Sequence, residues 1–388
     1  MTQAKHVSGS YDVAVVGGGP AGSTAALALA RQGVRVALFE KQGLPRYKPC
    51  GGGVTRRALR LVGIDVSDAV ERRCREVILT LGPEHSSFVM RTEEPLLSMV
   101  MRDRFDMALL DEARRAGVGV FPECPVTDVH RDGEGLRIVT TRGEARFRFA
   151  VAADGAIGRF SRLAGWRETR RLAPTLEIEL PVRGEQLRAL GETACFDFGA
   201  VAGGYAWVFP KRIHLSVGVG VFRRNGPARL SERLRAYTRR LGLHPVQAVK
   251  PHGSVIPVSP RKDGFVRNRV MLVGDAAGLA DPVTGEGIWA AVQSGLLAAE
   301  ALIQSDCREG QVRMAYEAAL RDRILDDLKI GRVLSSLVYA FPPLRNGLFA
   351  LCGNRLSRAM AQVVCGRARY KSLFSSPRNY LRLISPKA

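Results

Sequence analysis

The sequence predicts an α/β protein with three parts: a domain built on a β-α-β unit, an antiparallel β-sheet domain and a helical C-terminal segment. Three observations support this division. A glycine motif separates two short apolar runs near the N-terminus, polar and apolar residues alternate between about 166 and 257, and the segment after 327 is basic and largely apolar. With 388 residues, of which 46% are hydrophobic, the chain is long enough to bury more than one core.

The first element is a β-α-β unit. Residues 11–16 and 34–40 are apolar runs typical of buried strands, and an Ala/Leu-rich helix is predicted between them. The turn before that helix carries Gly17, Gly19, Pro20, Ala21 and Gly22, in the order G-x-G-x-x-G. Glycines at these positions allow a tight turn, a close approach of backbone to pyrophosphate, and close packing of helix on strand. The sequence therefore predicts a Rossmann-like dinucleotide site, with Glu40 placed to bind ribose hydroxyls.

A second site downstream favours FAD over NAD. The apolar strand predicted before Gly274 ends in Asp275, which is placed to bind the ribityl hydroxyls that a flavin has and NAD lacks. A long small-residue helix then starts at Gly285-Glu286-Gly287-Ile288. Its positive end would favour the anionic reduced flavin ring. The alternative is that G-D-A-A-G is only a tight turn from strand to helix.

Three further segments are candidates for cofactor contact. Asp154 follows a third apolar strand in V-A-A-D-G, and Arg102 opens an amphipathic helix, where a cation is unfavourable unless it meets a phosphate. The segment R-Y-K-P-C-G-G-G, residues 46–53, cannot form regular structure because proline and glycine break it. We expect the flavin ring to approach this backbone at Cys50, Gly51 and Gly53.

The block from about 166 to 257 alternates in polarity, which predicts half-exposed antiparallel strands of a substrate domain. Within it, Tyr205, Trp207 and Phe209 alternate and therefore share one face of a strand. Three aromatic side chains on one face suit an apolar substrate slot. We therefore favour a pocket, and the alternative is that Trp207 and Phe209 are ordinary core residues of the sheet.

The charge of the chain is concentrated near its end. The formal net charge is +21, and residues 328–388 carry eleven basic side chains and no acidic one. Apolar stretches there are interrupted by Pro342, Pro343 and Arg345, which argues against a membrane-spanning helix. The composition fits either a surface that rests on anionic lipid headgroups or a solvated basic helical tail. Nucleic acid is not expected as a partner, because no zinc-finger or RNA-binding signature is present.

Cysteine usage and the N-terminus suggest the compartment. The seven cysteines contain no C-x-x-C pair, so neither a disulfide framework nor a metal site is expected. The first residues lack the apolar core of a signal peptide. We therefore expect a cytoplasmic protein, with peripheral attachment to the inner face of the membrane if the tail binds lipid.

Taken together, G-G-G-P-A-G, A-A-D-G, G-D-A-A-G and G-E-G-I resemble the flavoprotein group typified by p-hydroxybenzoate hydroxylase. K-P-C-G-G-G at 48–53 and Y-A-W-V-F-P-K at 205–211 are similar to the geranylgeranyl reductase family in its bacterial form. The likeness covers most of residues 10–330. One position departs from the wider group, since Gly158 stands where serine is usual in the Asp154 motif.

The resemblance implies an FAD enzyme that saturates C=C bonds of a polyprenyl chain by hydride transfer from flavin N5. It implies a discontinuous FAD-binding domain of residues 10–165 and 256–330, a substrate domain of residues 166–255, and a basic helical segment of residues 331–388. Residues 72–100 are candidates to join the substrate sheet. The implied cofactor contacts are Gly17, Gly19, Pro20, Ala21, Gly22, Glu40, Lys41, Cys50, Gly51, Gly53, Arg102, Val126, Asp154, Asp275, Gly285, Gly287 and Ile288, with Tyr205, Trp207 and Phe209 facing the substrate.

Several alternatives stay open. Cys50 is either a catalytic thiol beside the flavin or a small residue chosen for fit, and Cys50 and Tyr205 are the candidate proton donors by position alone. The electron donor is NADPH or a reduced carrier such as ferredoxin. On the same scaffold, a monooxygenase or halogenase is the rival enzyme, and a module that binds prenyl chains without chemistry is the rival from another class.

Overall fold

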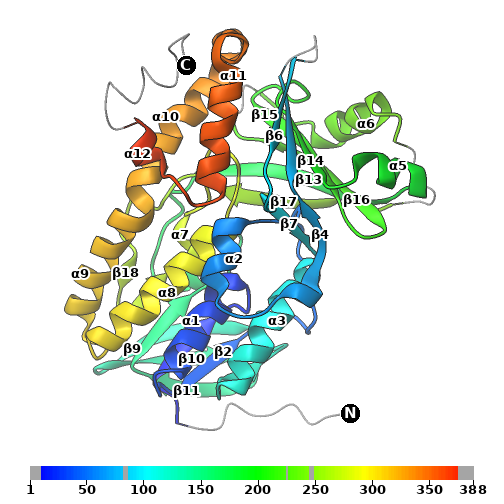
Figure 1. The fold of residues 1–388 in the computed structure, drawn as a ribbon. Helices are drawn as coiled ribbons and strands as arrows, with labels where there is room; N and C mark the ends of the chain where they lie inside the picture. Colours follow the sequence, from blue (N-terminus) through cyan, green and yellow to red (C-terminus); the bar gives the residue numbers. More distant parts are fainter. Residues whose placement is uncertain (1–9, 82–85, 224–225, 244–248, 375–388) are drawn as a thin grey trace.

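The computed structural model describes residues 10–81, 86–223, 226–243 and 249–374. Two segments discussed above lie outside this described part. They are the N-terminal residues, which were expected not to be a signal peptide, and the last fourteen residues of the basic tail. Within it, the strands form four sheets. The largest two are a mostly parallel sheet and a mostly antiparallel sheet, which confirms the predicted α/β class (Figure 1).

The parallel sheet is the centre of the cofactor domain. The apolar runs predicted as buried strands pair here, with Val13 opposite Val36 on one side and Phe149 on the other. All four residues of each of these strands are buried, as expected for a sheet covered on both faces. In spatial order its strands are β18 (Val266–Arg267), β19 (Val270–Leu272), β12 (Phe149–Ala152), β1 (Val13–Val16), β2 (Val36–Phe39) and β8 (Gly119–Phe121).

Helices and a small antiparallel sheet share the core of this domain. Helix α1 (Pro20–Ala30) packs on α8 (Ile288–Gln304) and on α3 (Arg102–Arg115), so three segments far apart in sequence meet above one sheet. The remaining helices here are α2 (Arg56–Val62), α4 (Phe160–Leu163), α7 (Gly274–Ala277) and α9 (Glu309–Leu320). The small sheets contain β9 (Val126–Asp132), β10 (Gly135–Thr140) and β11 (Gly143–Phe147), and β3 (Gly53–Thr55), β4 (Val70–Cys74) and β7 (Leu97–Val100).

The second large sheet includes two strands from early in the chain. Strand β14 (Thr193–Asp197) pairs in parallel with β5 (Glu76–Leu81), which pairs with β6 (Ser86–Arg91). In Figure 1 the two early strands, β5 and β6, are blue and extend into the green sheet. The order continues through β15 (Gly204–Pro210), β16 (His214–Val221), β13 (Leu172–Pro181) and β17 (His252–Pro257), and helices α5 (Gly184–Leu190) and α6 (Leu230–Arg240) belong to the same region.

The expectation of half-exposed strands is wrong for the centre of this sheet. Every residue of β15 is buried, and so are all but the first of β16. The reason is a second layer. The face carrying Ala206 and Val208 packs in a cluster with Leu234 and Tyr237 of α6, while the opposite face packs against residues of the C-terminal helices.

The C-terminal segment is helical, as predicted. It comprises α10 (Asp326–Ala340), α11 (Pro342–Val364) and α12 (Tyr370–Phe374), which stand beside the substrate sheet in Figure 1. Pro342 occupies the first turn of α11, where a missing N–H costs nothing. Across the described ranges, no helix is long and apolar enough to span a bilayer.

Part of the basic charge in this segment has a structural partner. Arg369 lies 3.3 Å from Asp327, Lys371 lies 2.8 Å from Asp326, and Arg367 lies 3.5 Å from Glu94. These pairs tie α12 and the turn before it to the start of α10 and to the β6–β7 connection. The tail is therefore not uniformly a solvated basic surface.

Candidate active site

The glycine motif forms a turn that excludes side chains. Gly17 has φ of +109°, and a Cβ there would lie 2.4 Å from the carbonyl oxygen of Ala153. A Cβ on Gly22 would lie 2.0 Å from the Gly17 oxygen. Gly19 differs, because the nearest atom to its Cβ position is Arg46 Nη2 at 3.6 Å. The loop is therefore closed on its protein side and open at Gly19, where a pyrophosphate is expected.

Glu40 directly follows strand β2 and contacts this loop. Its Oε2 accepts hydrogen bonds from the Gly18 N–H at 3.0 Å and from Arg46 Nε at 3.1 Å, and Oε1 accepts from the Gln42 N–H at 3.1 Å. The side chain is buried, with 4% of its surface exposed. Glu40 thus holds the glycine loop in place, and its predicted contact with ribose stays a prediction.

A buried chain of charges joins Glu40 to Arg102. Arg46 Nη1 lies 3.1 Å from Asp106 Oδ2, and Arg102 Nε lies 2.8 Å from Asp106 Oδ1. Sequence reasoning missed Arg46 and Asp106 as members of the site. The i, i+4 spacing of Arg102 and Asp106 on α3 was the available signal, whereas the pairing of Arg46 with Asp106 depends on the tertiary fold.

Gly51 and Gly52, which follow Cys50, have protein reasons as well as a predicted cofactor reason. A Cβ on Gly51 would lie 2.9 Å from the Phe209 ring and 3.0 Å from Trp207 Nε1. Gly52 has φ of +71°, and its Cβ would lie 2.1 Å from the carbonyl oxygen of Val100. The segment is therefore pressed between the aromatic strand β15 and the end of β7. These protein contacts are one reason for glycine here, and the approach of the flavin ring to the same backbone stays a prediction.

Two buried charged residues hold the same segment. Lys211 Nζ donates to the carbonyl oxygens of Gly51 and Val100, each at 2.8 Å, and the side chain is fully buried. Burial lowers the pKa of Lys211. On the other side, Glu177 Oε1 accepts from the Cys50 N–H at 2.6 Å. The sequence singled out Lys211 only as the end of Y-A-W-V-F-P-K, and Glu177 was missed.

Asp275 and the start of α8 lie on the same side of the parallel sheet. Asp275 lies in α7, and its Oδ2 is 3.8 Å from Lys48 Nζ. A Cβ on Gly287 would lie 3.2 Å from Asp275 Oδ1, so glycine leaves this carboxylate accessible. Helix α8 has no acidic residue in its first turn, but Glu286 Oε1, just before the helix, accepts the Trp289 N–H at 3.0 Å, so a carboxylate already takes up part of the positive end.

The glycine at position 158, where the wider group usually has serine, is explained by its contact with Asp154. A Cβ on Gly158 would lie 2.0 Å from Asp154 Oδ2, which instead accepts the Phe160 N–H at 2.8 Å. Asp154 Oδ1 is buried and has no hydrogen-bond partner among the described residues. Burial raises the pKa of Asp154. Its neighbours Ala153 and Gly155 line the cavity described below, whereas Asp154 does not, so its predicted contact with the cofactor stays a prediction.

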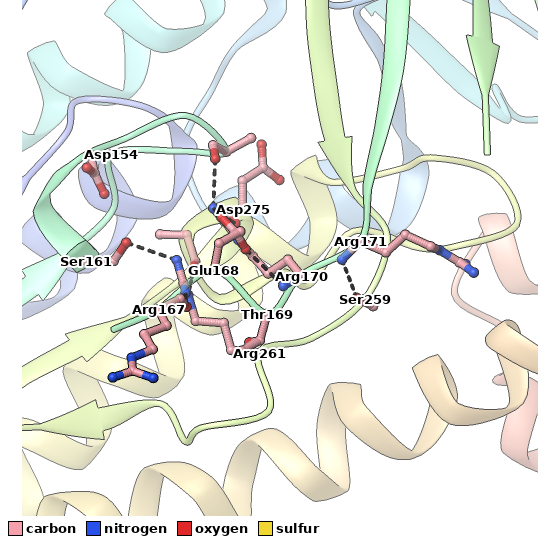
Figure 2. Close-up of polar contacts among 12 residues, drawn as sticks. Asp154, Ser161, Arg167, Glu168, Thr169, Arg170, Arg171, Ser259, Arg261 and Asp275 are labelled. Atoms are coloured by element: carbon pink, nitrogen blue, oxygen red, sulfur yellow. Dashed lines mark hydrogen bonds and ion pairs between the residues drawn. The ribbon is translucent and has the colours of Figure 1, made fainter. Parts of the chain in front are cut away.

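Arg170 and Arg261 connect the cofactor loops to the segments that lead into the substrate sheet. Sequence reasoning missed both. Arg170 donates to the carbonyl oxygens of Asp275 at 2.6 Å and Ala156 at 2.8 Å, while pairing with Glu168 (Figure 2). Arg261 donates to Ser161 Oγ at 3.0 Å, and to the backbone of Ala276 and Arg167. These side chains fix the Asp154 and Asp275 loops relative to each other.

A single large cavity brings most of the predicted residues together. Its volume is about 670 Å³, and it extends from the glycine loop past Cys50 and strand β15 to helices α10–α12. The predicted cofactor residues that line it are Gly19, Pro20, Ala21, Cys50, Gly51, Gly53, Arg102, Asp275, Gly285, Gly287 and Ile288. Lys41 is exposed and Val126 begins β9, and neither is among the lining residues.

The predicted substrate residues form one wall of this cavity. Tyr205, Trp207 and Phe209 are all buried and all line it, with neighbouring ring centroids 6.1 and 6.3 Å apart. The Tyr205 hydroxyl donates to the Thr284 carbonyl oxygen at 2.5 Å, and burial raises its pKa. Its proton is therefore engaged, which weakens Tyr205 as a proton donor. The facing wall comes from α10–α12, which the sequence did not predict to reach the site.

Comparisons with known proteins agree with this arrangement. Family models match residues 10–188, as an FAD binding domain, and residues 226–340, as a lycopene cyclase protein. A digeranylgeranylglycerophospholipid reductase of Thermoplasma volcanium is 31% identical, covering 81% of this chain and 84% of its own. A chloroplastic geranylgeranyl diphosphate reductase of Arabidopsis thaliana is 28% identical, covering 90% and 78%.

Solved structures show the same fold. A geranylgeranyl bacteriochlorophyll reductase-like protein of Thermoplasma acidophilum superposes with a TM-score of 0.77 at 24% identity, covering 97% of this chain and 96% of that one. A flavin-dependent brominase has a TM-score of 0.71 at 22% identity, covering 92% and 93%. The fold is therefore that of p-hydroxybenzoate hydroxylase-like flavoproteins, and the cofactor is FAD.

The residues of this site fit FAD. The open side of Gly19 and the uncapped N-terminus of α1 can take the pyrophosphate, and Asp275 can take the ribityl chain. The backbone from Cys50 to Gly53 and the start of α8 both border the cavity where the ring would lie.

Proposed function

Because this chain belongs to the geranylgeranyl reductase family of FAD-dependent oxidoreductases, we propose that it saturates isolated C=C bonds of a polyprenyl chain. One observation carries the proposal. The cavity that holds the cofactor loops continues, without a dividing wall, along three aromatic side chains into a space lined by aliphatic residues of α10 and α11. Such a space suits a long, flexible hydrocarbon rather than a small aromatic ring.

The residues of the chain have a defined part in this reaction. FAD, when bound and reduced, supplies the hydride. Tyr205, Trp207 and Phe209 hold the alkene, and their burial excludes water from the reacting atoms. Lys211 and Glu177 fix the Cys50–Gly53 backbone, which would border the flavin ring, so that substrate and cofactor share a rigid wall.

The test is anaerobic turnover. The purified protein is reduced with dithionite, and geranylgeranyl diphosphate or a digeranylgeranyl glycerophospholipid is then added while flavin absorbance and product mass are followed. We expect the oxidised flavin spectrum to return and the product to gain two mass units per double bond. Using both compounds shows whether a soluble diphosphate or a lipid is the substrate. Substituting NADPH or reduced ferredoxin for dithionite then identifies the electron donor.

Two rivals give different results in the same experiment. A monooxygenase or halogenase would leave the flavin reduced until oxygen is admitted, and the product would then gain oxygen or halogen. The brominase shares the fold, which alone does not separate these chemistries. A module that only binds prenyl chains would show binding with no return of flavin absorbance.

We predict that replacing Cys50 by alanine leaves turnover within about threefold of the wild type. The side chain is half-buried at the cavity, and its Sγ accepts the Gly52 N–H at 3.4 Å, which is a role in loop geometry. Its backbone N–H, held by Glu177, is untouched by the substitution. Steady-state turnover measures this, with Cys50→Ser as the control that retains a polar atom. A loss of a hundredfold in both variants would instead make Cys50 catalytic.

We further propose that the rim of the cavity rests on an anionic bilayer. Val333 lines the cavity and is 71% exposed, so the cavity reaches the surface at α10. Phe341, Leu344 and Leu351, on the α10–α11 connection and on α11, are 56%, 52% and 86% exposed. Apolar side chains beside basic ones favour an interfacial position, which places the mouth where a lipid substrate lies.

The prediction is that replacing Phe341, Leu344 and Leu351 by serine lowers co-sedimentation with phosphatidylglycerol vesicles several-fold. Ile213→Ser is the matched control, because Ile213 is 74% exposed in the β15–β16 turn, away from this rim. Equal sedimentation of the triple variant and the control would end the proposal. High salt is expected to weaken binding further by screening the basic residues.

A further inference from the structure

The unassigned part of the proposed reaction is the second hydrogen. We propose that Glu177 is the general acid that delivers a proton to the alkene carbon next to the one that receives the hydride. This inference rests on the proposed function. Glu177 lies on β13, its side chain is 3% exposed, and it lines the cavity beside Cys50.

The hydrogen bonds of Glu177 leave one oxygen free for this task. Both hydrogen bonds within the described chain go to Oε1, from the Cys50 N–H at 2.6 Å and from the Tyr47 hydroxyl at 2.9 Å. The proton of the neutral carboxyl is therefore carried by Oε2. The same bonds fix the carboxyl against the Cys50–Gly53 backbone. This backbone is also expected to border the flavin ring, so one segment positions both the acid and the ring.

Burial and the charges around Glu177 bring its pKa close to neutrality. Burial, followed by the neighbouring Glu179 carboxylate, raises the pKa of Glu177 to about 7, although Tyr47, the Cys50 N–H and Lys211 act in the opposite direction. His252 lies opposite Glu177 in the β13–β17 register, and His214 lies 2.9 Å from Glu179. A general acid works best when its pKa is close to the working pH.

A route from solvent returns the proton. Tyr47 is 37% exposed, donates to Glu177, and packs against the ring of His252 with centroids 4.6 Å apart. The hydrogens of the reaction then balance. The alkene receives a hydride with both electrons from the reduced flavin, which becomes oxidised, and a proton from Oε2 of Glu177. The carboxylate takes a proton from solvent, which reaches this region beside the partly exposed Tyr47, before the next turnover.

The test compares Glu177→Gln with Glu179→Gln. The amide keeps an oxygen for Tyr47 and Cys50, so Glu177→Gln should bind FAD and be reduced by dithionite like the wild type, while turnover falls 10²- to 10⁴-fold. The wild-type rate should fall tenfold per pH unit above about 7, and this limb should be lost in Glu177→Gln. Glu179→Gln should keep its low-pH rate and shift the limb to lower pH, because it removes the neighbouring negative charge.

Infrared difference spectra give a readout independent of turnover. The oxidised holoenzyme should show a carboxyl band that titrates near pH 7 and is lost only in Glu177→Gln. Turnover of Glu177→Gln within threefold of the wild type, with the same pH limb, would overturn the inference and leave the proposed function standing. A wild-type protein that is reduced but converts no prenyl compound would end both.

Discussion

Replacing Gly52 by alanine is expected to destabilise the protein by about 2–5 kcal/mol and to release its FAD. Gly52 combines a left-handed backbone with a Cβ position 2.1 Å from the Val100 carbonyl oxygen and 2.4 Å from Lys211 Nζ. The lysine end can move, but the carbonyl belongs to the backbone of β7. The Cys50–Gly53 segment must therefore shift toward the cavity, into space needed by the cofactor. Chemical denaturation and the flavin absorbance of the purified protein measure the two effects.

Gly33 provides a matched control for this prediction. Its φ is +77°, close to the +71° of Gly52, but no atom lies within 4 Å of its Cβ position. Gly33→Ala therefore has the backbone cost alone, about 1–2 kcal/mol, and should retain FAD. If the two variants had the same free energy of unfolding and the same flavin absorbance, the close approach of the Val100 carbonyl would not contribute to stability or FAD binding.

Replacing Arg170 by alanine is expected to cost about 3 kcal/mol and to weaken FAD binding. The guanidinium is 2% exposed, and its removal leaves the carbonyl oxygens of Asp275 and Ala156 without their donor. The loop that carries Asp275 then loses its direct link to the Asp154 loop and keeps the contacts made by Arg261. Thermal or urea denaturation of the apoprotein and titration with FAD measure stability and affinity separately.

Arg171 is the control, because it takes part through its backbone, with its N–H donating to Ser259 Oγ and its carbonyl oxygen accepting the Val258 N–H. Its side chain extends away from the network in Figure 2. Arg171→Ala should change stability by no more than about 0.5 kcal/mol. Equal losses in the two variants would show that the hydrogen bonds of Arg170 contribute little.

Acid sensitivity gives the same pair of variants a second readout. The hydrogen bond from Arg170 lowers the pKa of Glu168 from its usual value of 4.5 to about 2. A lowered folded pKa contributes stability above pH 4.5, and this contribution is lost as the pH falls from 4.5 toward 2. Arg170→Ala should lose that pH dependence, whereas Arg171→Ala should keep it.

The cofactor loops were predictable because their chemistry requires local spacing. A pyrophosphate turn needs glycines at fixed intervals, and an acid after a strand end can be read directly from the sequence, as with Glu40 and Asp275. Arg46, Arg170 and Glu177 were not predictable in this way. Each acts through partners that the fold brings from far away in the chain, and their local sequence shows only ordinary charged residues.

The substrate side of the site shows a second limit of the sequence. Tyr205, Trp207 and Phe209 were placed on one face correctly, because strand alternation is local. The opposite wall was missed, because an amphipathic helix has the same sequence pattern whether its apolar face covers a cavity or a bilayer. Alternation in β16 likewise suggested exposure, since one sequence does not show which second layer will cover a sheet.

The order of strands in the parallel sheet has a consequence for how the chain folds. Strand β1 has to find β12, where Val13 meets Phe149, and β12 has to find β19, where Ala150 meets Val270. Contacts so distant in sequence have a high loop-closure cost and slow the folding of a domain. The N-terminal β-α-β unit therefore lacks its neighbour β12 until residue 152 has been synthesised, and β12 lacks its own neighbour β19 until residue 272. We expect the nascent protein to depend on chaperones or on early FAD binding during that interval.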